Sequence, residues 1–373
     1  MSPTKTKQNI PQGWTLRKLS DVLDYERPDN YIVKSTSYSN KSKTPVLTAN
    51  KSFVLGYTDE DFGIYENIPA IIFDDFTTDS KYVDFPFKIK SSAIKILKEK
   101  NSNIDLRFVY EKMKSVNFPT GSHKRFYISQ YQNMEILTPP FLEQQKISEI
   151  LGTVDEDIAK TQEVIEATEK LKRGLMQQLF TSGIGHTKFK ETKIGEIPNE
   201  WEAVHLSTLI KLTSGKGLSK NKFIHGEFSV YGGNGISGTH NEYLLEKPTI
   251  IIGRVGEYCG AVHLTKPYSW VTDNALYIEK YLIEIEQTFL YYLLYFLNLN
   301  QYAKVGGQPS ISQDTVGHLQ IGLPSIVEQK KIAEILSTVD EKISVNKELK
   351  EKLTLLKKGL MQDLLSGNKR VKI

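Results

Sequence analysis

The chain has 373 residues, with 39% hydrophobic and 25% charged residues and a net charge of +4, which predicts a globular protein of two or three domains. Its longest apolar run, 289–297, is too short to span a bilayer, and the polar N-terminus predicts no secretion signal, so we expect a cytoplasmic protein. The single cysteine, Cys259, excludes a disulfide framework and a cysteine-based zinc cluster.

The first third of the chain predicts a globular domain that mixes helix and strand. We expect a disordered tail over residues 1–10 and a domain over residues 11–139. Arg107 to Val116 has the pattern of a helix. Three apolar runs bounded by polar turns predict strands: 44–47, 69–73 and 85–97.

Two long helices are predicted, at 140–183 and 324–367. Pro140 and Pro324 stand just before them, and Gly183 and Gly367 mark their ends. Apolar residues recur at heptad spacing in both, which predicts a coiled-coil seam. The seam residues are Ile147, Leu151, Val154, Ile158, Ile165, Leu175 and Leu179 in the first helix, and Ile332, Leu336, Val339, Ile343, Leu353, Leu360 and Leu364 in the second.

A second domain, with a linker, is predicted over residues 184–323, and a short tail over 368–373. The segment 286–299 is apolar all round, which favours a buried helix over a membrane or cofactor role. Strands are predicted at 228–231, 249–252, 260–264 and 275–278.

The chain contains an internal repeat with an offset of 185 residues. Residues 143–156 recur at 328–341 with 11 of 14 positions identical. Shorter matches in the same order link Gly-Leu-Met-Gln at 174–177 and 359–362, Ile-Ser-Gln at 128–130 and 311–313, and Pro-x-x-Trp at 11–14 and 198–201. Residues 20–127 and 208–310 show almost no similarity. We infer two copies of one plan with similar frames and divergent inserts.

The two helical segments carry opposite charge, which predicts that they pair with each other, most simply antiparallel. Residues 138–200 have a net charge of −3 and residues 324–373 of +4. The alternative to a paired coiled-coil spacer is that these are two ordinary amphipathic helices of a bundle. Four polar residues occupy seam positions and either fix the register or lie where the seam drifts to the surface: Thr161, Thr168, Lys172 and Asn346.

Five polar loops of the second insert, four of which contain glycine, are candidates for a nucleic-acid surface: 214–217, 231–235, 253–256, 270–274 and 306–310. Glycine lets backbone approach a phosphate, Arg and Lys suit phosphate or guanine, and Asn and Gln can pair with adenine. Hairpin turns are the alternative, and Asn234-Gly235 alone has the pattern of a type I′ turn. The candidate DNA-contacting residues are Lys216, Tyr231, Asn234, Arg254, Asn274 and Gln308.

The first insert offers a second set of candidates. They lie in three polar segments, the last of which is a compact basic loop that precedes Ile128-Ser129-Gln130: Asn50, Lys51, Thr78, Lys81, His123, Lys124 and Arg125. Asp74, Asp75 and Asp79 could form a metal site of a divergent nuclease. A solvated turn or cap cluster is the favoured interpretation, because no completing Glu-x-Lys pattern is present.

The sequence predicts no catalytic site. It lacks a Gly-x-x-x-x-Gly-Lys-Ser/Thr phosphate loop and a His-x-x-x-His pair. Thr138-Pro139-Pro140-Phe141 resembles an amino-methyltransferase motif, but threonine replaces the amide or carboxylate that holds the amine. We therefore expect no catalytic, cofactor or metal residues in this chain.

In its duplicated plan the whole chain resembles the specificity subunit of type I restriction–modification enzymes. The resemblance rests on the Trp-led starts of both halves, the Ile-Ser-Gln segments, and the helix openings and ends already quoted. It is supported in the inserts by the segments 45–50, 72–76, 231–235 and 272–275.

The resemblance implies an α+β fold: two target recognition domains separated by two long antiparallel coiled-coil helices with pseudo-twofold symmetry. Each domain would read one half of a bipartite, asymmetric DNA target, and the helices would set the gap. Two methyltransferase subunits, and through them restriction subunits, would dock on the chain. S-adenosylmethionine, ATP and Mg would belong to those partners. A two-domain protein-binding scaffold is the alternative.

The charge distribution predicts weak DNA binding by the chain alone. Residues 17–137 have a net charge of +2 and residues 201–323 of −1. Phosphate neutralisation dominates the affinity of DNA-binding proteins. We therefore expect the methyltransferase subunits to supply part of the contact.

Overall fold

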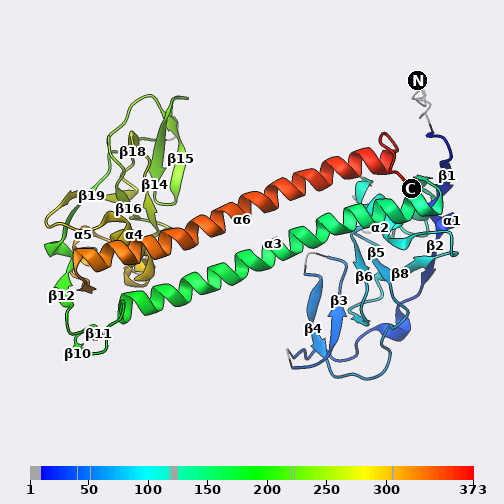
Figure 1. Cartoon of the computed structure of the whole chain (residues 1–373), viewed down its shortest axis with the longest axis horizontal. Coiled ribbons are helices and arrows are strands. Elements are labelled where there is room, and N and C mark those ends of the chain that lie inside the picture. Colours follow the sequence, from blue (N-terminus) through cyan, green and yellow to red (C-terminus); the bar gives the residue numbers. More distant parts are fainter. Residues whose placement is uncertain are drawn as a thin grey trace. The chain divides into compact units, whose positions relative to one another are not determined.

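The structure, a computed structural model, describes residues 10–39, 41–50, 52–116, 118, 125–219, 221, 223–304 and 306–373 (Figure 1). It divides into two compact units: unit 1 comprises residues 1–161 and 349–373, and unit 2 comprises residues 162–348. Each unit contains one insert and one half of each long helix. The tail expected over residues 1–10 lies outside the described residues, apart from the exposed Ile10.

Two helices of 41 residues, α3 (Phe141–Thr181) and α6 (Ile326–Ser366), occupy the two segments predicted to be helical. Beyond their C-terminal ends, Gly183 and Gly367 take φ values of +66° and +76°, the left-handed backbone that commonly ends a helix. The helices begin and end within two residues of the predicted bounds. The predicted domain boundaries stay a prediction, since the two compact units meet within the helices.

Within each unit, α3 and α6 are joined by ion pairs that establish an antiparallel arrangement. In unit 1, Lys357 Nζ lies 2.6 Å from Asp155 Oδ2. In unit 2, Lys172 Nζ lies 2.6 Å from Asp340 Oδ1, and an exposed pair joins Lys347 to Glu169 at 2.8 Å. Residue numbers rise along α3 where they fall along α6, so the antiparallel expectation is confirmed.

The predicted seam residues face the interior to different degrees. Nine are buried: Ile147, Leu151, Val154, Ile165, Leu179, Ile332, Leu336, Ile343 and Leu364. Five are partly buried: Ile158, Leu175, Val339, Leu353 and Leu360. Strict knobs-into-holes packing over the whole seam stays a prediction.

The polar seam positions divide into two kinds. Thr161 and Thr168 are buried, and their hydroxyls donate to the carbonyls of Asp157 and Val164 one turn back in the same helix. Asn346 likewise bonds within its own helix. Only Lys172, of the four, makes a described polar bond to the other helix, so the register interpretation fits Lys172 alone.

The insert of unit 1 consists of three small sheets and a covering helix. A four-stranded antiparallel sheet has the order β2-β8-β5-β6, and a three-stranded sheet has the order β4-β3-β7, with β3 and β7 parallel. The pair β1-β9 closes the insert just before α3. The bounds are β1 Thr15–Lys18, α1 Leu19–Val22, β2 Leu23–Glu26, β3 Thr44–Leu47, β4 Val54–Thr58, β5 Ala70–Asp74, β6 Ser80–Val83, β7 Lys88–Ile89, β8 Ile94–Glu99, α2 Leu106–Ser115 and β9 Glu135–Thr138.

The insert of unit 2 has the same topology, although the two inserts show almost no sequence similarity. Its sheets are β13-β19-β16-β17, β15-β14-β18 with β14 and β18 parallel, and the pair β12-β20. The predicted linker contains an additional hairpin, β10-β11. The bounds are β10 Phe189–Thr192, β11 Gly195–Pro198, β12 Glu202–His205, β13 Ile210–Ser214, β14 Phe228–Gly232, β15 Gly235–His240, β16 Ile250–Gly253, β17 Val262–Leu264, β18 Ser269–Val271, β19 Ala275–Tyr281, α4 Gln287–Phe296, α5 Gln313–Gly317 and β20 Gln320–Leu323.

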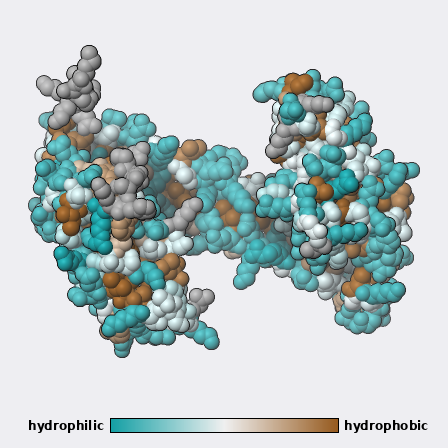
Figure 2. Space-filling model, turned by 180° about the vertical axis from the view of Figure 1, so that it is seen from behind, coloured by the Kyte–Doolittle hydropathy of each residue, from teal (hydrophilic) through white to brown (hydrophobic). Residues whose placement is uncertain are grey.

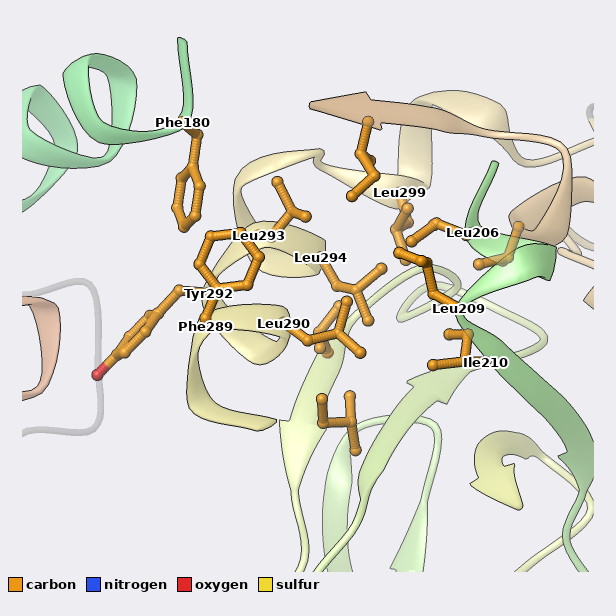
Figure 3. Packing of buried hydrophobic residues seen from close by; sticks show 14 of the residues in the cluster. Phe180, Leu206, Leu209, Ile210, Phe289, Leu290, Tyr292, Leu293, Leu294 and Leu299 are labelled. Carbon is orange, nitrogen blue, oxygen red and sulfur yellow. The ribbon is translucent and has the colours of Figure 1, made fainter. Parts of the chain in front are cut away.

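The apolar segment of unit 2 forms the buried helix that the sequence predicts. Phe289, Leu290 and Leu294 of α4 are completely buried between the sheet and the loop that carries Leu206 (Figure 3). The ring of Phe180 from α3 lies 5.7 Å from that of Phe289, which joins the long helix to the same core. The face of the molecule seen in Figure 2 is largely hydrophilic with small separate apolar patches. No helix among the described residues is long and apolar enough to cross a membrane.

A glutamate, buried in unit 1 and partly buried in unit 2, joins the start of each sequence repeat to the long helices. In unit 1, Glu143 accepts from Trp14 Nε1 at 3.2 Å and from the Arg370 guanidinium at 2.6 and 2.7 Å. In unit 2, Glu328 accepts from Trp201 Nε1 at 3.0 Å, and the side chain beside it is His186, whose Nε2 lies 3.0 Å from Glu328 Oε1. The segment 368–373, expected as a tail, therefore contributes a structural contact through Arg370.

The His186 contact predicts a pH dependence of stability that its Arg370 counterpart lacks. Burial alone would lower the pKa of His186, but hydrogen bonds and charge from Glu328 and Glu200 outweigh it and raise the pKa. The charged His186 ring therefore adds its full contribution to the free energy of unfolding below about pH 6.5. This contribution is lost as the pH rises through the pKa of His186 in the folded state. We expect His186→Arg to flatten the fall in melting temperature over this range. Equal slopes for the wild type and His186→Arg would contradict this role.

Candidate nucleic-acid interface

In unit 2, the five polar loops that the sequence singled out meet at one end of the two sheets. Backbone hydrogen bonds link Lys216 N to Val271 O, Thr272 N to Tyr231 O, and Arg254 N to Asn274 O. Gly256 N donates to Pro309 O, which brings in the fifth loop. We name the segments 214–217, 231–235, 253–256, 270–274 and 306–310 the loop junction of unit 2.

Glycine is required where these loops cross. A Cβ at Gly253 would lie 2.2 Å from the Tyr258 carbonyl oxygen and 2.6 Å from that of Gly233. One at Gly215 would lie 2.3 Å from the carbonyl oxygens of Val271 and Thr272. These glycines therefore serve close loop packing. At the β14-β15 turn only Gly235 has a positive φ, so the hairpin forms but is not type I′, which needs two such residues.

Five of the six predicted residues of the second insert are exposed at this junction: Lys216, Asn234, Arg254, Asn274 and Gln308. Tyr231 is the exception and requires a correction. It is only 4% exposed, and its hydroxyl accepts a hydrogen bond from Lys266 N at 3.0 Å. Its register in β14 corresponds to that of the buried Leu47 in β3, so Tyr231 packs in the core and is not part of the exposed surface.

Unit 1 builds an equivalent junction from a different sequence. Asp75 N donates to Ala93 O, and Phe126 N donates to Asp75 O. The same two bonds recur in unit 2, where Arg254 N donates to Asn274 O and Ile311 N to Arg254 O. Asp75 and Arg254 therefore occupy equivalent positions after the buried strands β5 and β16, with opposite charges.

The structure brings together part of the predicted set of unit 1. Asn50 Oδ1 accepts from the Thr77 hydroxyl at 3.4 Å, next to Thr78, which has a φ of +61°. The guanidinium of Arg125 lies 5.8 Å from the centre of the Phe76 ring in the same loop. Lys81 lies beyond this loop on β6. Lys51, His123 and Lys124 lie outside the described residues.

Each junction contains a pocket at the start of its Ile-Ser-Gln segment, which lies at 128–130 in unit 1 and at 311–313 in unit 2. In unit 1 a pocket of about 530 Å³ is lined by ten residues that include Tyr25, Arg27, Lys95, Arg125 and Ser129. In unit 2 the equivalent pocket of about 380 Å³ is lined by residues that include Ser214, Arg254, Lys304 and Ser312. Sequence reasoning missed Arg27, Lys95 and Lys304, because only the strand register brings them here and they belong to no recognisable motif.

Two of the three aspartates considered as a metal site, Asp74 and Asp75, have structural partners. Asp74 Oδ1 accepts from the backbone of Phe76 and Thr77, and so caps its own turn. Asp75 Oδ1 accepts from Tyr127 N, and its other oxygen lies 3.5 Å from Lys95 Nζ. Across the described part of the chain, no group of three potential ligands among His, Cys, Asp and Glu is placed to hold a metal.

The fold and the two equivalent junctions define a duplicated binding protein with two independently varied surfaces. A family model for the type I restriction modification DNA specificity domain matches residues 11–169 and again residues 198–355. The chain belongs to this family.

Individual relatives agree with this membership. The EcoR124I/EcoR124II specificity subunit of Escherichia coli is 38% identical over 216 residues, which is 55% of this chain and 50% of that protein, so the match spans half of its length. The MjaVIII specificity subunit of Methanocaldococcus jannaschii is 26% identical over 407 aligned residues, covering 97% of this chain and 94% of that one. The S subunit of a type I restriction–modification system from M. genitalium has the same fold, with a TM-score of 0.71, 20% identity, and coverage of 98% and 99%.

Proposed function

We propose that this chain is the non-catalytic DNA-recognition subunit of a type I restriction–modification complex in the cytoplasm. The observation that carries the proposal is the double match to the DNA specificity family together with two loop junctions of the same backbone plan. Each junction presents exposed Arg, Lys, Asn or Gln side chains, which are the groups that contact phosphates and base edges.

The two junctions support an asymmetric target. Equivalent positions carry Asp75 in one and Arg254 in the other, and Lys95 in one and Leu276 in the other. The Asp75 carboxylate is buried and paired with Lys95, whereas the Arg254 guanidinium is exposed and suits guanine or phosphate. The half-sites should therefore differ in sequence.

The long helices have two proposed roles. A helix of 41 residues is about 61 Å long, which suits a spacer between two half-sites on DNA. Apolar residues spaced by seven stay exposed on both helices: Val164 and Leu171 in unit 2, and Leu349 and Leu356 in unit 1. The pairs are related by the repeat offset, which favours docking of two copies of one partner.

We propose that these two copies are methyltransferase subunits, with restriction subunits joining through them. The name of the E. coli relative is that of a type I restriction enzyme specificity subunit. S-adenosylmethionine, ATP and Mg are assigned to the partner subunits. This chain contributes recognition and positioning only.

Methylome sequencing tests the proposal directly. Cells that carry the chain should methylate adenine in one bipartite, asymmetric motif, and deletion of its gene should abolish that motif alone. Restoring the gene should restore it. An unchanged methylome would favour the protein-binding scaffold, and metal-dependent cleavage by the purified chain would favour a nuclease.

Substitutions at the unit 2 junction should affect one half-site only. We expect Asn234→Ala and Arg254→Ala each to lose about 1–3 kcal/mol of binding and to relax the second half-site. Competition binding with DNA altered in either half-site measures this. Lys211→Ala is the matched control, because Lys211 is exposed at the opposite end of β13, where it pairs with Glu279. Unchanged affinity and motif for both junction variants would refute the proposed surface.

The modest charge of the inserts predicts that the chain alone binds DNA weakly. We expect an affinity about tenfold or more below that of the complex with methyltransferase subunits, and a shallower salt dependence, since fewer phosphates are neutralised. Fluorescence anisotropy at several salt concentrations compares the two. Leu171→Glu combined with Leu356→Glu should remove the gain by blocking docking. Tight, steeply salt-dependent binding by the chain alone would contradict the expectation.

A further inference from the structure

A polar cluster interrupts the apolar seam in unit 2. Lys172 Nζ of α3 lies 2.6 and 2.8 Å from the two carboxylate oxygens of Asp340 on α6. The Tyr292 hydroxyl of α4 donates to Asp340 at 2.8 Å, and Lys172 lies 5.1 Å from the centre of the Tyr292 ring. Three helices therefore meet at one ion pair.

An equivalent cluster lies in unit 1. Lys357 Nζ of α6 lies 2.7 and 2.6 Å from the two carboxylate oxygens of Asp155 on α3. It also lies 3.2 Å from the completely buried Glu111 of α2, and Arg107 donates to Asp155 at 2.9 Å. Burial alone would raise the pKa of Asp155, but Lys357 outweighs it and lowers the pKa.

The two clusters are copies of one arrangement. The repeat offset of 185 relates Asp155 to Asp340 and Lys172 to Lys357. The third partners also correspond, because Glu111 and Tyr292 each lie six residues after the N-cap of their helix, at Asp105 and Glu286. We call the Lys172–Asp340–Tyr292 and Lys357–Asp155–Glu111 clusters the two seam nodes.

A second contact fixes each insert helix to the long helices. Gln144 Oε1 accepts from Asp105 N, and Gln329 Oε1 accepts from Glu286 N. Each insert helix is thus held at its N-cap and again two turns later at the node. Two such points determine both the position and the direction of the insert helix on the pair.

We propose that the two seam nodes are positioning residues that select the gap length between the half-sites. The inference rests on the proposed function. The side chains are 18% and 36% exposed in the Lys172–Asp340 pair, and 9% and 31% exposed in the Lys357–Asp155 pair. A polar seam position penalises shifted registers. Within its own unit, each node fixes the register of α3 against α6 and ties the insert to that register, so the register sets where that insert lies along the long helices.

The test removes the charges of one node and keeps its shape. In Lys172→Met with Asp340→Asn, the asparagine still accepts from Tyr292. The complete complex with methyltransferase subunits is given DNA substrates whose half-sites match the target and whose gap is native, or one base pair shorter or longer. We expect the preference for the native gap to fall about tenfold, within the range of coupling between contacting residues.

The matched control is the other ion pair between the same helices in unit 2. Lys347 and Glu169 are 2.8 Å apart; the carboxylates of the two pairs are similarly exposed, at 38% and 36%, but Lys347 is 56% exposed and Lys172 only 18%. Lys347→Met with Glu169→Gln should keep the native preference. The exchanged pair Lys172→Asp with Asp340→Lys should recover it, whereas Lys172→Asp alone places two carboxylates together and should lose it.

The outcomes separate this inference from the proposed function. If the neutral double variant methylates the native gap with undiminished preference, the nodes are structural only and the inference fails. Should that variant not fold, Asp340→Asn alone gives the same decision with a smaller change. If the wild-type complex shows no bipartite target at all, the proposed function itself fails.

Discussion

Burial of the heptad faces of α3 and α6 is the interaction on which the rest of the structure depends. Neither helix could exist alone in water, because its apolar seam, from Ile147 to Leu179 or from Ile332 to Leu364, would be exposed. In each unit the two halves cover one another and also close the core of the insert, as Leu336 and Phe180 do in unit 2. Glu143 and Glu328 then fasten the start of each repeat to this pair through an indole N–H and a basic side chain. The helix pair is therefore part of both hydrophobic cores and does not merely link them.

In each insert, the main-chain hydrogen bonds that fix the loops do not depend on which side chains the loops carry. Hydrogen bonds between main-chain atoms set the loop junctions, so the bonds made by Asp75 recur unchanged at Arg254. The side chains at those positions differ in charge and in exposure, since Asp75 is buried beside Lys95 and Arg254 is exposed. A binding protein built in this way can change its target without changing its fold. The buried Lys95–Asp75 pair shows that even the electrostatics of the pocket can differ while its walls stay in place.

The charge balance fits a protein that works in a larger assembly. The inserts present a few well-placed cations, such as Arg27, Arg125 and Arg254, and no continuous basic surface is evident from the sequence. We therefore expect affinity from phosphate neutralisation to come largely from a partner, and the orientation and register on the DNA to come from this chain. The exposed apolar residues Leu171 and Leu356 offer such a partner two related contacts. The seam nodes connect the inserts, which we propose read DNA, to the long helices, which we propose bind the partner. Each node contacts an insert helix and both long helices.

The sequence by itself determined the duplication, the two long helices, their antiparallel pairing and the buried helix α4, because periodicity, proline and glycine positions, and repeated segments are local signals. It also located four of the strands of unit 2 and all five polar loops of its junction. It missed short strands such as β1, β12 and β18, whose three or four residues pair only with distant segments. It placed Tyr231 on the surface, and it overlooked Arg27 and Lys304. Only the tertiary structure decided that the two dissimilar inserts share one topology and one pocket position, and that Lys172 and Lys357 meet Asp340 and Asp155. Those facts depend on strand register and on contacts between residues far apart in the chain, which no local pattern of side chains encodes.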